Sequence, residues 1–326
     1  MMKSAANVVF FGSDRICLPF LDFLLEEGVD HCRLAAVISQ PDRRQGRGHK
    51  LSQNPVAEWA TRRGVALWQP EKPDAALVES LIELETVVGF VMAYGHFLPK
   101  SLRHAPTYGL VNFHGSILPA YRGASPVETA LAEGESITGV SLMKVVREMD
   151  AGGVADVEEV PIEPSDTAAI VRAKVGASVV PLMRRNLSAA ITGSLRFVEQ
   201  NAALVTHCRK ITKEDGALDF TLPAEKICAR LRAFTPWPGG YFTHNGEHIK
   251  LGASSYSEEI MDVPPGTVLA SSGNADLRIV CQKGVLLIHE LQRPGGRMLP
   301  VADFLRGYPL APGLHLPSVP VRSLVV

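Results

Sequence analysis

The sequence lacks most of the features that reveal a protein class directly. Its 326 residues include only five cysteines, an odd and scattered number without a Cys-x-x-Cys pair, which argues against a disulfide framework and a zinc ribbon. No uninterrupted apolar run approaches the ~20 residues of a membrane span. The first residues also lack the apolar stretch of a signal peptide. We therefore expect a cytoplasmic protein without a membrane partner.

An excess of charge of one sign is absent too. The chain has 33 basic and 34 acidic residues, for a net charge of −1, which excludes a protein that coats nucleic acid with a wholly basic surface. One local exception is the segment 43–50, which carries arginine and lysine side chains and no acid. That segment is either a solvated, flexible arm or a contact for nucleic-acid phosphates.

Several familiar motifs are also missing. The first apolar run ends in Gly12-Ser13-Asp14-Arg15, not in Gly-x-Gly-x-x-Gly, which weakens the case for a dinucleotide site. The chain has neither a phosphate-binding P-loop motif nor a Gly-x-Ser-x-Gly nucleophile elbow. His244 and His248 are spaced as in helical metal sites, but Asn245-Gly246 between them predicts a hairpin. We therefore assign no metal.

The arrangement of apolar segments predicts two domains, as the length of the chain does. In residues 1–204, short β-branched runs alternate with helical patterns, and a periodic stretch at 168–198 predicts a closing helix. Strands that are apolar on both faces and separated by helices are typical of an α/β, Rossmann-like domain with a parallel sheet. In residues 205–326, glycine, proline and short β runs dominate, which indicates a small C-terminal β-barrel.

Candidate chemistry is densest around the predicted strand 110–114. Asn112 and His114 are two residues apart and so share one face of that strand, at its carboxyl end, where open α/β sheets bind ligands. Together they can direct hydrogen bonds to one carbonyl oxygen, which suits acyl transfer. Asp150 could orient His114. The alternatives are that Asn112 caps a turn, that His114 is a buried core histidine, and that Asp150 belongs to a turn without chemistry.

Taken together, several motifs resemble those of the methionyl-tRNA formyltransferase family, over most of the chain. In the first domain they are a Phe-Gly-Ser first turn, Gln40-Pro41-Asp42-Arg43, Ala93-Tyr94-Gly95, the block from Asn112 to Pro126, and Met149-Asp150-Ala151-Gly152. In the second domain they are Lys210-Ile211-Thr212-Lys213-Glu214-Asp215-Gly216 and Phe234-Thr235-Pro236-Trp237-Pro238. The Asn-x-His block is shared widely among folate-dependent formyltransferases, whereas the Gln-Pro-Asp-Arg and Pro-Trp-Pro segments are more specific to the tRNA branch.

The resemblance implies transfer of a formyl group from 10-formyltetrahydrofolate to the α-amine of methionine carried by initiator tRNA. Asn112, His114 and Asp150 match the family's catalytic trio. Asn112 and protonated His114 would stabilise the oxyanion of the tetrahedral intermediate. Asp150 would hold His114 and, with water, help to remove the proton of the attacking amine. We expect the protein to act as a monomer.

The resemblance also implies binding residues. The folate-contacting segment of the family matches Ser116, Ile117, Leu118 and Pro119, and backbone around Phe90 and Tyr94 would line the pterin pocket. The residues implied to contact tRNA are Arg47 against the acceptor stem, supported by Arg43, Arg44 and Lys50, together with Lys210 and Lys213. The C-terminal domain resembles an oligonucleotide-binding barrel, a fold suited to following a nucleic-acid backbone.

Two departures from the family pattern and several rival functions accompany this hypothesis. Gly153 stands where the family often has aspartate, and His49 replaces a common lysine. A formyltransferase for an amino sugar nucleotide, or a hydrolase of formyl-folate, would share the trio but would not need the basic segment or the second domain. A catalytically silent tRNA-binding protein would not depend on Asn112 or His114.

Overall fold

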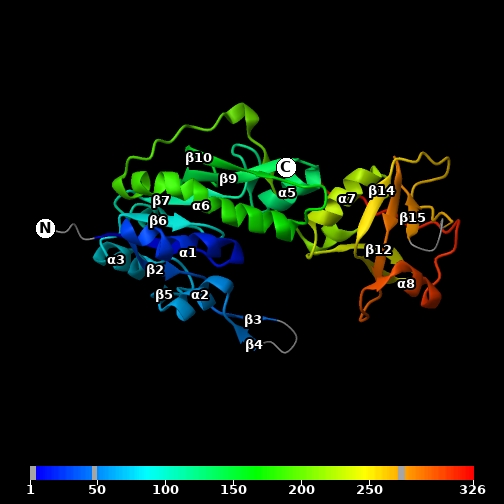
Figure 1. Ribbon diagram of the computed structural model, residues 1–326, viewed down its shortest axis with the longest axis horizontal. Helices are drawn as coiled ribbons and strands as arrows, with labels where there is room; N and C mark the ends of the chain where they lie inside the picture. Colours follow the sequence, from blue (N-terminus) through cyan, green and yellow to red (C-terminus); the bar gives the residue numbers. More distant parts are fainter. Residues whose placement is uncertain (1–4, 46–49, 271–275) are drawn as a thin grey trace. The chain divides into compact units, whose positions relative to one another are not determined.

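The computed structural model describes residues 5–45, 50–270 and 276–326, which form two compact units (Figure 1). Unit 1 comprises Met1–Gly123, Ile137–Pro161 and Arg172–His207, and unit 2 comprises Ala124–Ser136, Ile162–Val171 and Cys208–Val326. Most of unit 2 thus follows the predicted boundary at residues 204 and 205, but Ala124–Ser136 also groups with it. The boundary itself remains a prediction.

Unit 1 is built on a sheet of seven strands in the order β10-β9-β7-β6-β1-β2-β5. Strands β1, β2, β5, β6 and β7 pair in parallel, whereas β9 pairs antiparallel with both β7 and β10. Their bounds are β1 Ala6–Phe11, β2 Cys32–Ile38, β5 Leu67–Trp68, β6 Val88–Val91, β7 Leu110–His114, β9 Ile137–Lys144 and β10 Val154–Pro161. The chain moves outward from β1 to β2 and then returns to β6 on the other side, so β1 and β6 form a topological switch point. In such sheets ligands bind beyond the carboxyl ends of the strands.

Both faces of this sheet are buried, which explains why its strands are apolar throughout. Val9 and Phe11 pack with Leu81 of α3 (Ala75–Glu83) in one apolar cluster. Phe10 points the other way, toward Phe20 of α1 (Leu18–Glu26), with 5.9 Å between ring centroids. Alternate residues of a strand face opposite sides of the sheet, so helices must cover both sides. The predicted parallel α/β sheet is therefore confirmed.

The helices of this half of the chain begin and end at recognisable signals. Their bounds are α1 Leu18–Glu26, α2 Pro55–Arg63, α3 Ala75–Glu83, α4 Lys100–Arg103, α5 Pro126–Glu133 and α6 Ala168–Thr192. At the start of α2, the Asn54 side chain accepts hydrogen bonds from two backbone amides, and Gly64 ends the helix in the left-handed region. The predicted helix at 168–198 is confirmed but ends earlier, because Gly193 has a φ of +72°.

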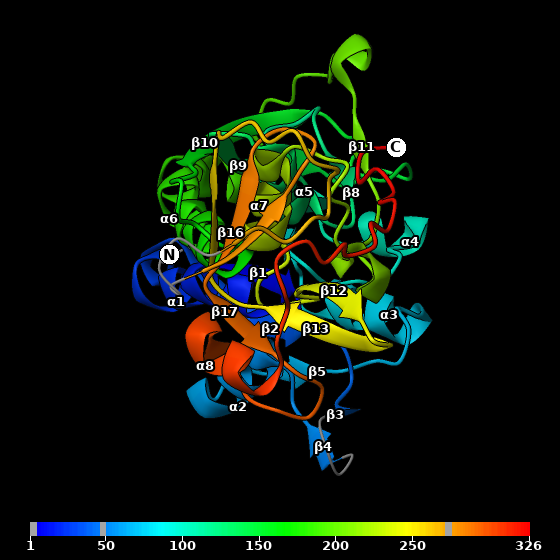
Figure 2. The same cartoon turned by 90° about the vertical axis from the view of Figure 1, so that its right-hand side faces the viewer.

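The basic segment forms a hairpin. Strand β3 (Arg43–Gln45) pairs antiparallel with β4 (Lys50–Ser52), and the hairpin projects from the end near α2 in both views (Figures 1 and 2). Residues 43–45 and 50–52 are thus held together by a ladder of backbone hydrogen bonds. Residues 46–49 lie outside the described residues.

Unit 2 contains two antiparallel sheets around one apolar core. One sheet has the order β12-β13-β17-β18, and the other β14-β16-β15. The bounds are β12 Gly240–His244, β13 Glu247–Leu251, β14 Ser254–Ser257, β15 Leu277–Val280, β16 Val285–Ile288, β17 Glu290–Gln292 and β18 Leu299–Pro300, with helices α7 Ala224–Ala233 and α8 Val301–Gly307. The predicted hairpin at Asn245-Gly246 joins β12 to β13, and both turn residues have positive φ, at 50° and 76°. The predicted small β domain is confirmed.

The remaining short elements complete the connections. They are strands β8 Arg122–Gly123 and β11 His207–Cys208, and 3-10 turns at Arg15–Cys17, Gly28–Asp30, Ala202–Leu204 and Lys213–Gly216. No helix in the described part of the chain is long and apolar enough to cross a membrane. All five cysteines are buried free thiols.

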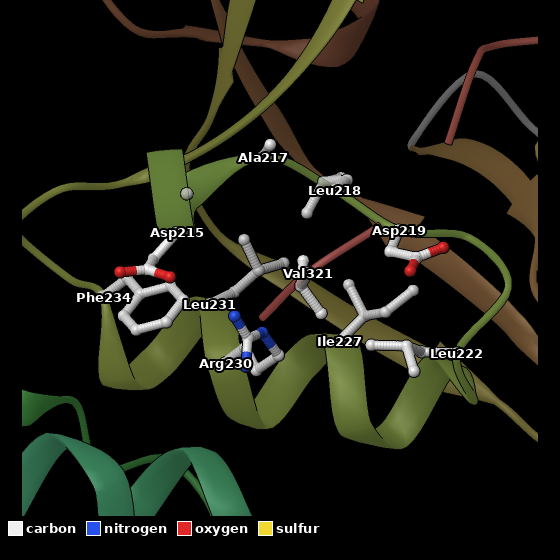
Figure 3. Close-up of a pocket in the computed structure, with 11 residues that line it drawn as sticks. Asp215, Ala217, Leu218, Asp219, Leu222, Ile227, Arg230, Leu231, Phe234 and Val321 are labelled. Carbon is white, nitrogen blue, oxygen red and sulfur yellow. The ribbon is translucent and has the colours of Figure 1, made fainter. Parts of the chain in front are cut away.

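A small cavity in unit 2 is lined by a buried arginine side chain. Arg230 of α7 lies between Asp215 and Asp219 (Figure 3) and is only 6% exposed. Its guanidinium packs over the Phe234 ring, 5.0 Å from the centroid, while its Nη2 atom has no hydrogen-bond partner among the described residues. Burial lowers the pKa of Arg230, against the opposing effect of the nearby carboxylates. The neighbouring Arg209 instead pairs directly with Asp215, at 2.5 Å.

Candidate active site

Strand β7 places two polar side chains at the carboxyl edge of the unit 1 sheet. Asn112 lies opposite Val91 of β6 and Met143 of β9, and His114 lies opposite Ser141. His114 is buried, whereas Asn112 is half-buried and its side chain forms no hydrogen bond to the described part of the chain. Because residues i and i+2 of a strand share a face, the free amide lies beside the imidazole. The amide of Asn112 is therefore available to a ligand.

The geometry around His114 determines its tautomer. Its Nε2 atom lies 2.9 Å from the backbone carbonyl of Tyr121, and its Nδ1 atom lies 3.5 Å from the Oδ2 atom of Asp150. A carbonyl oxygen only accepts hydrogen bonds, so Nε2 carries a proton and donates it. The other ring nitrogen, Nδ1, faces the carboxylate of Asp150.

Asp150 lies in the turn between β9 and β10 and is held in an unusual conformation. Its φ is +52°, in the left-handed region that residues with a side chain rarely adopt. Its Oδ2 atom accepts a hydrogen bond from the backbone amide of Gly123, at 2.9 Å. The turn also requires Gly152, since a Cβ atom there would lie 1.9 Å from the carbonyl oxygen of Lys144. The glycine of the Asp-x-Gly sequence is therefore required for steric reasons.

The departure at Gly153 also has a local explanation. A Cβ atom at this position would lie 3.0 Å from Cβ of Phe197 and 3.2 Å from the carbonyl oxygen of Val198. Val198 pairs with Val154 through two backbone hydrogen bonds of 2.9 Å, so this neighbour is fixed. Glycine allows the segment to approach the turn closely, and Asp150 still reaches His114.

Three groups in this site were missed by sequence reasoning: the Tyr121 carbonyl, the Gly123 amide and the side chain of Gln200. The Nε2 atom of Gln200 donates to the carbonyl oxygens of Asp150, at 2.8 Å, and Gly152, at 2.7 Å. Its Oε1 atom accepts from Nε and Nη2 of Arg122, at 3.0 and 2.9 Å. Two of these groups are backbone atoms, and Gln200 lies in an irregular segment without periodicity, so no local signal pointed to them.

The predicted folate segment 116–119 divides into two buried and two accessible residues. Ser116 is fully buried and donates its hydroxyl to the carbonyl of Ala120, at 2.6 Å. Leu118 is also buried, with its amide on the Ser141 hydroxyl. Ile117 and Pro119 are half-buried. A ligand at this segment would therefore meet Ile117 and Pro119, while Ser116 shapes the turn.

The side chains of Phe90 and Tyr94 both point into the core. Phe90 packs against Phe20, at 5.1 Å between ring centroids, and stacks on Phe113 at 6.0 Å. Tyr94 is 2% exposed, its hydroxyl has no hydrogen-bond partner in the described part of the chain, and burial raises its pKa to about 12. Only the backbone of these two residues is left for a ligand, and their role in a pterin pocket stays a prediction.

The predicted tRNA-binding residues belong to both units. Arg43 is exposed on β3, and Arg44 and Lys50 lie in the same hairpin. Arg47 and His49 lie outside the described residues. Lys210 and Lys213 are exposed in unit 2.

Metal ligands do not gather in the described ranges 5–45, 50–270 and 276–326. No three histidine, cysteine, aspartate or glutamate side chains lie close enough there to hold an ion. His244 and His248 lie on opposite strands of the β12–β13 hairpin, and His248 stacks on Tyr241 with 4.4 Å between ring centroids. Their spacing of four residues therefore does not place them on one face of a helix.

An amide, an imidazole and a carboxylate at the ligand-binding edge of an α/β sheet are the groups that acyl transfer requires. Two family models agree with this chemistry: "Formyl transferase" matches residues 6–183, and "Formyl transferase, C-terminal domain" matches residues 210–309. The fold and the site thus define the class, a two-part formyl transferase.

Relatives define the family more narrowly. A methionyl-tRNA formyltransferase from Myxococcus xanthus is 39% identical, covering 95% of this chain and 97% of its own. Another from Caldanaerobacter subterraneus subsp. tengcongensis is 34% identical, covering 95% of this chain and 99% of its own. The chain belongs to the methionyl-tRNA formyltransferase family.

Solved structures support the fold. An N-formyltransferase from Helicobacter canadensis, in complex with folinic acid and dTDP-3-aminofucose, covers 89% of this chain and 100% of its own, with a TM-score of 0.65 and 18% identity. The sugar 3N-formyl transferase WlaRD, solved with dTDP and 5-N-formyl-THF, covers 90% of this chain and 100% of its own, with a TM-score of 0.64 and 17% identity. At such low identity the similarity concerns the architecture.

Proposed function

We propose that the protein transfers the formyl group of 10-formyltetrahydrofolate to the α-amine of methionine on initiator tRNA. The observation that carries the proposal is the near full-length similarity to methionyl-tRNA formyltransferases, which extends through both units. Enzymes that formylate amino sugars are related to this chain only as distant structural neighbours.

The proposed reaction uses the site as an oxyanion hole. The amine nitrogen attacks the formyl carbon, and the former carbonyl oxygen becomes negatively charged in the tetrahedral intermediate. The amide N–H of Asn112 and the Nδ1–H of charged His114 then donate hydrogen bonds to that oxygen. Preorganised donors of this kind stabilise the transition state more than the ground state.

The intermediate then breaks down to products. The amine must lose one proton, and Asp150, through a water molecule, is the base we propose for it. The bond between the formyl carbon and N10 of the folate breaks, its electron pair stays on N10, and N10 takes up a proton. The products are formyl-methionyl-tRNA and tetrahydrofolate. In this scheme Nε2–H of His114 donates to the Tyr121 carbonyl, and Asp150, whose Oδ2 lies 3.5 Å from Nδ1, faces the ring without taking up the Nδ1–H that donates to the oxyanion.

A formyl-transfer assay tests the proposal. The purified protein is given 10-formyltetrahydrofolate with methionine-charged initiator tRNA, and uncharged tRNA and an amino sugar nucleotide serve as controls. We expect formyl-methionyl-tRNA only with the charged tRNA. Formylated sugar would indicate the sugar branch, folate turnover without an acceptor would indicate the hydrolase, and no turnover would favour a silent tRNA-binding protein.

Three further statements belong to this proposal. We propose that the protein acts as a monomer in the cytoplasm, and light scattering on the purified protein tests the oligomeric state. We also propose that the hairpin arginines and Lys210 and Lys213 contact the tRNA, while segment 116–119 contacts the folate. The exposed positions of Arg43, Lys210 and Lys213 support their assignment.

A further inference from the structure

We propose that Gln200 is a positioning residue of the reaction, because it fixes the turn that carries Asp150. Gln200 acts through Asp150 and is not assigned a contact with either substrate. The inference rests on the proposed function, in which Asp150 orients His114.

The amide group of Gln200 anchors the backbone of the Asp150 turn on both sides. Its nitrogen donates one hydrogen bond to the carbonyl of Asp150, at 2.8 Å, and one to the carbonyl of Gly152, at 2.7 Å. A primary amide has two N–H donors, so both are used for this one turn. Asp150 has a φ of +52°, a conformation that residues with a side chain rarely adopt and that needs support from its surroundings.

The same side chain connects this turn to the segment that holds the Asp150 carboxylate. Its Oε1 atom accepts two hydrogen bonds from Arg122, at 3.0 and 2.9 Å. The next residue, Gly123, donates its backbone amide to Oδ2 of Asp150, at 2.9 Å. Gln200 thus holds the backbone of Asp150 directly. It also holds Arg122, and the neighbouring residue Gly123 holds the carboxylate of Asp150 through its backbone amide.

This closed arrangement determines where the carboxylate stands relative to His114. The Oδ2 atom that accepts from Gly123 is the same atom that lies 3.5 Å from Nδ1 of His114. Rotation of the turn would move that atom away from the ring. A misplacement of about 1 Å in a catalytic geometry costs on the order of 100-fold in rate.

Two substitutions separate the two ends of the Gln200 side chain. Gln200→Leu has a similar size and removes all four hydrogen bonds. Gln200→Glu keeps an oxygen for Arg122, where a charge strengthens the contact, but it places an acceptor against the two turn carbonyls. If Gln200 positions Asp150, we expect both variants to lose about 10- to 100-fold in kcat, with KM for the charged tRNA within about twofold of the parent.

The matched control is Asn186→Leu. Asn186 is also half-buried in unit 1, and its amide donates two hydrogen bonds, to Asp156 at 2.6 Å and to the carbonyl of Leu182 at 2.8 Å. This variant should lower the melting temperature about as much as Gln200→Leu while keeping the parent kcat. A general loss of stability is thereby distinguished from a loss of positioning.

A double-mutant cycle with Asp150→Asn supplies the second readout. If Gln200 acts through the carboxylate of Asp150, Gln200→Leu should have little further effect on kcat in the Asp150→Asn background. Additive losses, or a parent-like kcat in Gln200→Leu or Gln200→Glu, would overturn the inference. Failure of the proposed function is a different result, since the parent protein would then form no formyl-methionyl-tRNA.

Discussion

At the scale of single residues, the site depends on which atoms are already occupied. His114 donates through Nε2 to a backbone carbonyl, which leaves Nδ1 for the chemistry. Asn112 is the polar neighbour on the same strand face, and its amide is not used by the described part of the chain. Ser116 and Tyr94, by contrast, turn their hydroxyls inward. Neighbouring residues of one motif therefore differ in role: some side chains are available to a ligand and others are turned into the protein.

Replacement of Asn112 tests the proposed oxyanion hole. Asn112→Ala should lower kcat by about 100- to 1000-fold, because one preorganised donor to the developing oxyanion is lost. Single-turnover rates with saturating substrates measure the effect. Asn201→Ala, at an exposed position outside the site, serves as the control. An unchanged rate in Asn112→Ala would contradict the proposed role.

Replacement of Tyr94 tests whether its side chain contributes to folate binding. Its hydroxyl is buried without a partner, and such a group carries a desolvation cost of about 1–3 kcal/mol. Tyr94→Phe should therefore raise the free energy of unfolding, or leave it unchanged, and should not alter KM for the formyl donor. Urea unfolding and initial rates measure both quantities, with Tyr108→Phe at an exposed tyrosine as control. A higher donor KM in Tyr94→Phe would show that the hydroxyl reaches the ligand.

At the scale of elements, a turn and a hairpin carry functional side chains, and the strands and helices support them. The Asp150 turn joins β9 to β10 and requires Gly152, because any side chain there would collide with the backbone of Lys144. The β3–β4 hairpin presents Arg43 to solvent.

The basic hairpin should contribute to tRNA binding through phosphate contacts. Arg43→Ala and Arg47→Ala should each raise KM for the charged tRNA, and the effect should shrink as salt concentration rises, because counterion release is then worth less. Initial rates at several salt concentrations check this, while KM for the folate donor serves as the internal control. An increase in the donor KM alone would refute the assignment of the hairpin.

At the scale of the whole molecule, the two units have separate cores. The core of unit 2 forms from β12 to β17 with helices α7 and α8, whereas one apolar cluster of unit 1 lies between its sheet and α3. Helix α5 belongs to unit 2, where Glu133 pairs with Lys226 of α7 at 2.5 Å.

The proposed boundary can be tested with a fragment that ends at residue 204. We expect the unit 1 sheet to fold, because its strands and covering helices are all present, but α5 would lose its contacts with α7. The fragment should therefore unfold cooperatively in urea at a lower midpoint than the full chain. Circular dichroism follows the transition, and the absence of any cooperative transition would contradict the boundary.

The stability of unit 2 should depend on pH through Asp215. Burial raises the pKa of this carboxyl, but hydrogen bonds from Arg209 and from the backbone of Thr212 outweigh it, so that the pKa is lowered overall. A group with a lowered folded-state pKa stabilises the fold above its unfolded value and loses that contribution as the pH falls through the folded value. Asp215→Asn should cost about 2–3 kcal/mol at pH 7, because the half-buried Arg209 loses its charged hydrogen-bond partner.

Urea unfolding of the parent and of Asp215→Asn, at pH 7 and at progressively lower pH, measures this dependence. The difference between the two proteins should diminish below about pH 4, where the unfolded carboxyl is protonated. Arg230→Met is the contrasting variant, since it removes a buried cation without a full set of hydrogen bonds and should leave stability equal or higher. A constant difference across the pH range would contradict the assigned role of Asp215.

The sequence by itself determined the elements of this protein and the types of chemical groups in its site. Apolar runs on both faces of a strand require covering helices, and Asn245-Gly246 requires a hairpin, because these are local consequences of burial and backbone sterics. Only the tertiary structure decided which groups meet. Gln200 reaches Asp150 across 50 residues of chain, and the Tyr121 carbonyl selects the tautomer of His114. Such contacts depend on chain paths through space, and a backbone carbonyl or an isolated glutamine leaves no periodic pattern in the sequence.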